Sequence, residues 1–312
     1  MNAAASSGRR SGRVASGDAS DLLMAGQKAI SGNDSLAAPA AVRRVGAVQA
    51  ERVIAGLSPL ERDIVTSLGR VRLASGRQLQ RLHFPPTLSG QRQARRVLTG
   101  LTDRRVLARL GRSIGGRRAG SAGFVYSLDI IGLRLLRPDG AWRRPWAVGQ
   151  SFVAHAVAVA ECYAQLVEGG RDGRWRLLDF QAEPACWRRF AGPRGRHSTL
   201  KPDAFAAVVI GRFEDRWYLG VDRATEDLGR IQRKARTYLD YWHTGREAVF
   251  PRVLWVTIRP ARQAALARAL CDLPAEGRAL FRVCIAEQFA DVIAAGADAE
   301  NIDQQVTGGG EG

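Results

Sequence analysis

Residues 58–102 read SPLERDIVTSLGRVRLASGRQLQRLHFPPTLSGQRQARRVLTGLT, and this stretch decides the fold of the first half of the chain. A helix is expected to begin here, because Ser58 is a favourable N-cap, Pro59 suits the first helical position and Glu61 completes a capping box. Apolar residues then recur on one helical face, at Leu60, Ile64, Val65 and Leu68. The stretch therefore opens with an amphipathic helix.

Two more helices are predicted in the same stretch. The second begins at Ser75, with Gln78 as its capping partner. The sequence FPPT, residues 84–87, ends it, because a pair of prolines cannot continue a helix. The third helix is expected from about Ser89 to Thr102.

Two strands are expected after the third helix, near 106–114 and 123–128, with the basic loop GGRRAGSA between them. Three helices followed by a β-hairpin is the order of a winged helix, so we expect a winged-helix domain over 51–136. Residues 1–50 are rich in Ala, Gly, Ser and Arg and predict a disordered basic tail. Residues 137–150 predict a linker.

The second half of the chain alternates between helical and strand patterns. The expected helices are at 151–168, about 227–243 and 260–270, and the expected strands are near 175–181, 203–210, 216–222, 252–258 and 280–285. This alternation implies an α/β fold with a mixed sheet, which we place at 151–290. The remaining residues, 291–312, are expected to form a flexible tail.

The charge of the chain is large and unevenly distributed. The formal net charge is +17, which indicates a polyanionic partner. Only three of the basic residues are Lys, so GC-rich coding offers another explanation for the abundance of Arg. However, residues 58–128 contain 14 basic and 3 acidic residues, whereas residues 147–312 contain 22 and 21. Coding bias alone would not segregate the charge, and this favours a functional basic surface.

The third predicted helix has two distinct faces. One face carries Ala94, Val97, Leu98 and Leu101, and the opposite face carries Arg92, Arg95, Arg96 and Thr99. Arginines at this spacing suit the phosphates and guanine edges of a major groove. Arg117 and Arg118 at the hairpin tip are expected to reach a neighbouring phosphate or the minor groove. The partner predicted from these residues is double-stranded DNA, and the alternative is a solvated face on a protein-interaction domain.

Several other classes of protein are excluded by the sequence. No apolar run approaches the roughly 20 residues that cross a bilayer, and the first residues lack the apolar segment of a secretory signal. The four cysteines form no CxxC pair, which argues against a zinc ribbon and a disulfide scaffold. We therefore expect a cytoplasmic protein with reduced thiols and no membrane partner.

Acidic residues stand at the ends of predicted strands. Asp203 begins one strand and Asp222 ends the next, so both carboxylates are expected at one edge of the sheet, where they can hold Mg²⁺. Such a metal polarises a phosphodiester and activates a nucleophile. Glu183, just after an earlier strand, is a third candidate oxygen ligand, and Lys234 is a candidate to offset transition-state charge. The alternative is that these carboxylates only form turns and cap helices.

Four segments resemble the replication-relaxation family of plasmid and mobile-element proteins. They are LSPLERDIVTSLGRVRLASGRQLQRLHF from Leu57, HAVAVAECYAQL from His155, KPDAFAAVV from Lys201 and YLGVDRATEDLGRIQRKARTYLDYW from Tyr218. The resemblance covers roughly residues 57–285. It implies a role in plasmid replication or DNA relaxation, and for some members a mobilisation relaxase built on a restriction-endonuclease-like PD-(D/E)XK core.

The sequence departs from this family at the candidate site. Members usually carry an acidic residue two positions before the aspartate of the strand ending VDRAT, and this chain has Gly220 there. Position 222 is Asp, where a PD-(D/E)XK site has Lys. Because positions 220 and 222 share a strand face, a carboxylate is missing beside the expected metal position. His155 resembles a family histidine, although a single His in such a position is more often a packing or capping residue.

The fold class expected is α/β with an N-terminal winged helix and a C-terminal mixed-sheet, restriction-endonuclease-like domain. The function expected is DNA binding in plasmid or mobile-element replication or relaxation, with a nuclease-like domain that is degenerate or active. The alternative is a non-catalytic winged-helix transcription regulator, whose α/β domain dimerises or senses a ligand. A third class is an active metal-dependent DNA nickase. The sequence leaves open whether the chain forms a homodimer.

Overall fold

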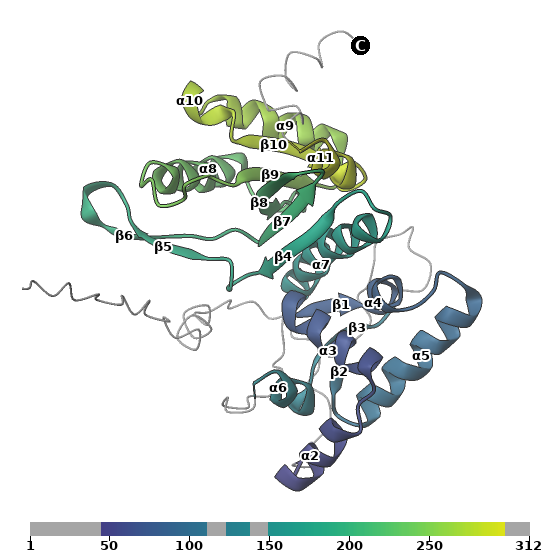
Figure 1. Ribbon diagram of the computed structural model, residues 1–312. Helices are drawn as coiled ribbons and strands as arrows, with labels where there is room; N and C mark the ends of the chain where they lie inside the picture. Colours follow the sequence, from purple (N-terminus) through teal and green to yellow (C-terminus); the bar gives the residue numbers. More distant parts are fainter. Residues whose placement is uncertain (1–44, 111–122, 138–148, 297–312) are drawn as a thin grey trace, which may run out of the picture. The chain divides into compact units, whose positions relative to one another are not determined.

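The computed structural model describes residues 45–110, 123–137 and 149–296 (Figure 1). Within these ranges the protein has a mixed α/β fold. Most of the predicted tail at 1–50, most of the predicted linker at 137–150, and the hairpin residues Arg117 and Arg118 lie outside them. Residues 297–312 of the expected tail at 291–312 lie outside them as well, but residues 291–295 are not a tail, because they belong to a helix that buries Ile293.

The first part of the chain contains five helices and three short strands within its described ranges. In chain order they are α2 (Ala47–Ala55), α3 (Pro59–Val71), β1 (Leu73–Ser75), α4 (Gly76–His83), α5 (Leu88–Asp103), β2 (Leu107–Leu110), β3 (Val125–Leu128) and α6 (Ile130–Leu136). The three predicted helices are therefore present as α3, α4 and α5. Helix α2 begins inside the range predicted as a tail.

Both predicted capping boxes are present at the helix starts. The backbone N–H of Glu61 donates to Ser58 Oγ at 3.3 Å, and the N–H of Ser58 donates to Glu61 Oε2 at 2.9 Å. The same reciprocal pair joins Gln78 to Ser75, at 3.2 and 2.9 Å. Each box satisfies two of the N–H groups that the first turn of a helix leaves without partners.

The short strand β1 is not evident from the sequence, because it has only three residues between two helices. It pairs antiparallel with β3, which also pairs antiparallel with β2, so the small sheet has the order β1-β3-β2. Helices α3, α4 and α5 bury their apolar faces against this sheet and each other, through Ile64, Leu68, Leu79, Leu98 and Leu101.

The second part of the chain is built on a five-stranded sheet. Its elements are α7 (Gln150–Arg171), β4 (Arg176–Ala182), β5 (Arg188–Ala191), the 3-10 turn η1 (Pro193–Gly195), β6 (His197–Leu200), β7 (Ala204–Ile210), β8 (Phe213–Val221), α8 (Leu228–Trp242), β9 (Arg252–Thr257), α9 (Pro260–Cys271), α10 (Ala275–Arg278), β10 (Phe281–Ile285) and α11 (Phe289–Ala295). The strand order is β10-β9-β8-β7-β4. Strands β4, β7 and β8 are antiparallel and β8, β9 and β10 are parallel, which confirms the predicted mixed sheet.

Helices cover both faces of this sheet. Helix α7 lies on one face, and helices α8 and α9 lie on the other (Figure 1). Side chains of β8 alternate accordingly: Trp217 and Leu219 pack in the core with α7, whereas Tyr218 packs with α8 and α9. Both cores are aromatic and aliphatic, and they hold the ends of the strands in fixed positions.

Strands β5 and β6 form a separate two-stranded sheet that the sequence analysis did not predict. They occupy the connection between β4 and β7. We refer to this hairpin, residues 188–200, as the ribbon. Its strands have four residues each, too short for a clear alternation of apolar and polar positions.

Helix α7 also contacts the first part of the chain. Arg81 of α4 forms ion pairs with Glu161 and Glu168 of α7, both at 2.5 Å. Gln78 donates to the carbonyl oxygen of Val157 at 2.9 Å, and Arg171 donates to the carbonyl oxygen of Arg81 at 2.7 Å. Of the described helices, none combines the length and the apolar character needed to cross a membrane.

Candidate functional site

Helix α5 presents three arginines to solvent. Arg92, Arg95 and Arg96 are exposed, whereas Ala94 and Leu98 on the opposite side are buried. We call the three side chains the arginine face. Within the described ranges, none of them forms an ion pair or hydrogen bond with another residue. Their guanidinium groups are therefore free to bind an external anion.

Other arginines in the same part of the chain stabilise the fold. Arg104 pairs with Glu61 of α3, and Arg105 pairs with Asp129 in a bidentate contact whose second bond measures 3.0 Å. Arg62 donates to backbone carbonyls at the end of α2. Arg109 lies over the ring of Phe124, with its guanidinium carbon 4.1 Å from the centroid. The arginine face differs from these residues because its side chains have no such partner among the residues that the structure describes.

The strand order brings the three predicted carboxylates to one edge of the large sheet. Because β7 is antiparallel to both β4 and β8, the start of β7 lies beside the ends of β4 and β8. Glu183 follows β4, Asp203 precedes β7 and Asp222 follows β8. We call this region the carboxylate edge. Their positions agree with the strand ends expected from the sequence.

Asp203 is held by a histidine and by the backbone of the next strand. Its Oδ1 lies 3.4 Å from Nε2 of His155 on α7, and its Oδ2 accepts a hydrogen bond of 2.6 Å from the N–H of Val221. Burial lowers the pKa of His155, but the hydrogen bond and charge of Asp203 outweigh this, so the pKa is raised above the usual range of His. The pair therefore resembles an oriented imidazolium–carboxylate contact.

Glu183 lies close to the same pair. Burial and the nearby charge of Asp203 raise the pKa of Glu183 above its usual range. Arg72, at the end of α3, opposes this shift from 3.8 Å. Glu183 is therefore a carboxyl that retains its proton to higher pH than an exposed glutamate, and it lies within the electrostatic reach of His155.

Asp222 is bound by an arginine that the sequence analysis missed. Nε and Nη2 of Arg262 donate to its two carboxylate oxygens at 2.6 and 3.3 Å, and the N–H of Ala224 donates to Oδ1 at 3.2 Å. The side chain of Asp222 is only 1% exposed. Arg262 lies in the first turn of α9, directly after β9, whose end meets the same sheet edge. The parallel pairing of β8 with β9 is the signal that could have indicated this contact.

Lys234 and Gly220 have neighbours that define this region further. The ammonium of Lys234 forms an ion pair with Glu226 at 2.8 Å and lies 6.0 Å from the ring centroid of Trp255. A Cβ at Gly220 would lie 2.8 Å from the ring of Trp255. The space where a family carboxylate was expected is therefore filled by the indole.

A Mg²⁺ ion at the carboxylate edge would need carboxylate oxygens that are free to bind it. Both oxygens of Asp222 are engaged by Arg262, and both oxygens of Asp203 have protein partners. In the part of the chain that the structure describes, no three His, Cys, Asp or Glu side chains are grouped to hold a metal. The residues as placed do not fit the predicted ion. The catalytic roles of Asp203, Asp222, Glu183 and Lys234 stay predictions.

Comparison with known proteins gives one result. The sequence matches the replication-relaxation family over residues 65–253, which is more than half of the chain. No curated protein and no solved structure matches it. The matched range includes the arginine face, the carboxylate edge and the ribbon. The chain therefore belongs to the replication-relaxation family.

Proposed function

We propose that this protein binds double-stranded DNA during the replication of a plasmid or mobile element. The observation that carries the proposal is the arginine face of α5, three exposed guanidiniums without a protein partner in the described ranges. Membership of the replication-relaxation family supports a role in replication.

The arrangement of the first part of the chain supports a winged helix with α5 as its recognition helix. Helices α3, α4 and α5 are followed by β2 and β3, and β1 completes the sheet. Helix α5 has 16 residues, and at 1.5 Å per residue it is about 24 Å long. A helix of this kind fits the major groove, with arginines that contact phosphates and guanine edges.

The packing of α4 and α5 leaves the arginine face of α5 uncovered. Helix α4 uses its polar side to bind α7, through Gln78 and Arg81. The apolar side of α5 packs on α4 and β2. The arginine face points away from its buried side chains, so DNA can approach it without displacing a structural contact.

We further infer that the second part of the chain is the restriction-endonuclease-like domain. Its support is the mixed sheet and the meeting of Glu183, Asp203 and Asp222 at one edge. The cluster holds its charges in contacts within the protein, His155 with Asp203 and Arg262 with Asp222. We propose that this domain serves chiefly to position DNA or a partner.

DNA binding is tested with two matched variants of the full chain. Arg92→Ala with Arg96→Ala removes two charges from the arginine face. Arg176→Ala with Arg212→Ala removes two exposed charges at the opposite end of the large sheet, and it serves as the control. Binding to a linear duplex of random sequence is measured by fluorescence anisotropy over a range of salt concentrations.

The expected result is a selective loss in the first variant. Each phosphate contact releases roughly one counterion, so the dependence of log K on log salt should become shallower by about 2 units. Each lost base contact would add about 1–3 kcal/mol on a specific site. If the α5 variant binds like the control, with the same salt dependence, the arginine face is not the DNA interface.

A further inference from the structure

The ribbon carries positive charge and no acidic side chain. Residues 188–200 contain four Arg and no Asp or Glu. The surrounding 147–312 region is almost neutral, with 22 basic and 21 acidic residues. The ribbon therefore has a local excess of positive charge within a nearly neutral region.

The two faces of the ribbon differ in character. The register pairs Phe190 with Ser198 and Arg189 with Thr199, so Phe190 and Leu200 share one face. Both are buried in the core with Tyr241 and Tyr218. The other face carries Arg189, Ala191, His197 and Thr199, and its residues are exposed or partly exposed. One face thus anchors the ribbon and the other is presented to solvent.

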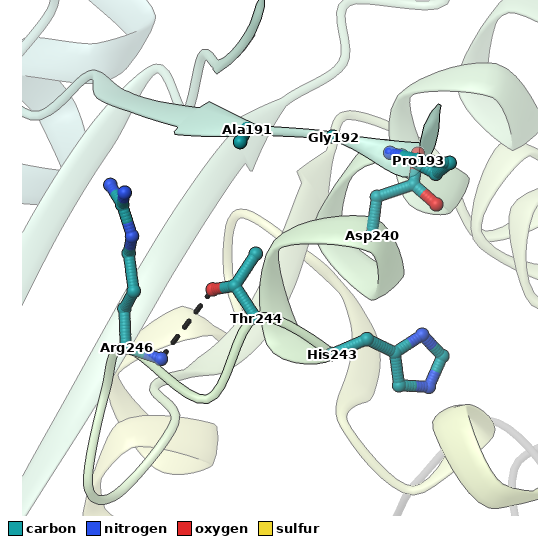
Figure 2. Close-up of a pocket in the computed structure, with 7 residues that line it drawn as sticks. All are labelled: Ala191, Gly192, Pro193, Asp240, His243, Thr244 and Arg246. Carbon is teal, nitrogen blue, oxygen red and sulfur yellow. Dashed lines mark hydrogen bonds between the residues drawn. The ribbon is translucent and has the colours of Figure 1, made fainter. Parts of the chain in front are cut away.

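The ribbon is fixed in place by contacts with α8 and the segment after it. The rings of Phe190 and Tyr241 lie with centroids 5.2 Å apart. Arg246 donates from Nη1 to the carbonyl oxygen of Arg189 at 2.9 Å. Between the ribbon turn and the end of α8 is a cavity of about 380 Å³, lined by Ala191, Gly192, Pro193, Asp240, His243, Thr244 and Arg246 (Figure 2).

The basic residues of the ribbon divide into fixed and available groups. Arg188 on the inner face lies 4.0 Å from Glu247 and near the ring of Phe205, so it belongs to the fold. Arg189 and Arg196 are exposed, and the structure gives their side chains no ion pair in the described residues. Lys201 is exposed at the base of the ribbon, with its ammonium 4.7 Å from the ring centroid of Trp187. Arg189 and Arg196 are therefore charges that an external anion can bind.

The chemistry of the outer face fits nucleic acid better than protein. None of the exposed large apolar side chains in the described residues lies in the ribbon. Protein interfaces have an apolar core from which charged residues are depleted. By contrast, Arg, His and Thr side chains on a fixed scaffold suit phosphate oxygens. A two-stranded ribbon also has the dimensions to enter a major groove.

We propose that the ribbon is a second DNA-binding element, whose outer face and turn bind the phosphate backbone of double-stranded DNA. The proposal rests on the proposed function and extends it from the first half of the chain to the second. Arg189 on the outer face and the exposed Arg196 at the ribbon turn supply the charge, and Thr199 supplies a hydroxyl donor.

The test uses the full chain and a linear duplex of random sequence. Arg189→Ala with Arg196→Ala is compared with the control Arg176→Ala with Arg212→Ala and with the α5 variant Arg92→Ala with Arg96→Ala. Anisotropy titrations at several salt concentrations give affinity and salt dependence. Thermal unfolding of each variant verifies that the fold is kept. A further variant, Arg189→Lys with Arg196→Lys, retains the charge.

The expected result is a weaker salt dependence for the ribbon variant, by about 2 units, with an affinity loss of about tenfold or more at low salt. The lysine variant should restore both. If the ribbon variant matches the control while the α5 variant loses affinity, the ribbon proposal is wrong and the proposed function stands. If all variants match the control, both are wrong.

With duplex DNA, a loss of affinity confined to the ribbon variant would support the ribbon and exclude the arginine face.

Other nucleic acids test the class of ligand. The titrations are repeated with single-stranded DNA and with double-stranded RNA of the same sequence. If the ribbon variant loses affinity only for one of these and not for duplex DNA, the proposed ligand class is overturned.

Discussion

The pairing of Asp222 with Arg262 makes a strong prediction about stability. The perturbation is Arg262→Met, which keeps most of the volume of the side chain and removes its charge. Arg262 donates two hydrogen bonds to a carboxylate that is only 1% exposed, and a third, of 2.5 Å, to the carbonyl oxygen of Glu226. Without the guanidinium, Asp222 retains one hydrogen bond in the described structure, from the N–H of Ala224.

The magnitude follows from the cost of a buried charge without a partner. Breaking a buried ion pair by removing one member typically costs about 3–5 kcal/mol. A domain has only about 5–15 kcal/mol of stability in total, so the change should be plainly visible. Replacing Asp222 by Asn as well removes the unpaired charge. The double variant Asp222→Asn with Arg262→Met should therefore be more stable than Arg262→Met alone.

The assay is urea unfolding of the full chain, followed by circular dichroism and by tryptophan fluorescence. Arg262→Lys serves as the charge-preserving control and should lose less stability than Arg262→Met. A loss below about 1 kcal/mol in Arg262→Met would refute the reasoning. It would mean that the buried carboxylate of Asp222 does not depend on Arg262 for the stability of the fold.

Three further predictions concern single positions. Burial lowers the pKa of His83 to about 4. Between this value and the unfolded pKa near 6.5, the unfolded chain binds a proton that the folded chain does not, so stability is greatest above pH 6.5 and falls as pH falls toward 4. Unfolding titrations over this pH range should show a loss of up to about 3 kcal/mol that His83→Phe lacks. Gly220→Glu should lower the free energy of unfolding by about 1–3 kcal/mol, because the new side chain meets the ring of Trp255, and an unchanged urea midpoint would contradict this. Ser58→Ala should cost about 1 kcal/mol through loss of the capping box, whereas Ser58→Asp should remain near wild type in the same measurement.

Much of the fold could be predicted because its signals are local. Ser58 and Ser75 mark helix starts through residues only three positions away, and these caps are present in the structure. The meeting of Asp203 and Asp222 at one edge followed from the order of two adjacent strands. Local pattern and sequential strand pairing are the features that a single sequence expresses most directly.

The rest depends on contacts between distant segments. Asp222 and Arg262 are 40 residues apart, with a helix and a parallel strand between them, and no residue near position 222 indicates their hydrogen bond. Likewise, the sequence alone shows only that Gly220 supplies no carboxylate ligand. The structure adds that the ring of Trp255, on the neighbouring strand, fills the space beside Gly220. The charge of the ribbon was hidden for a different reason, because averaging over residues 147–312 cancels it against acidic residues elsewhere.

Helix α7 has a structural consequence for the molecule. Its Glu161 and Glu168 grip Arg81 of α4, and six residues before Glu161 it carries His155, which contacts Asp203. The same helix therefore joins Arg81 of α4 to Asp203 at the carboxylate edge, so the two regions share one continuous structural element.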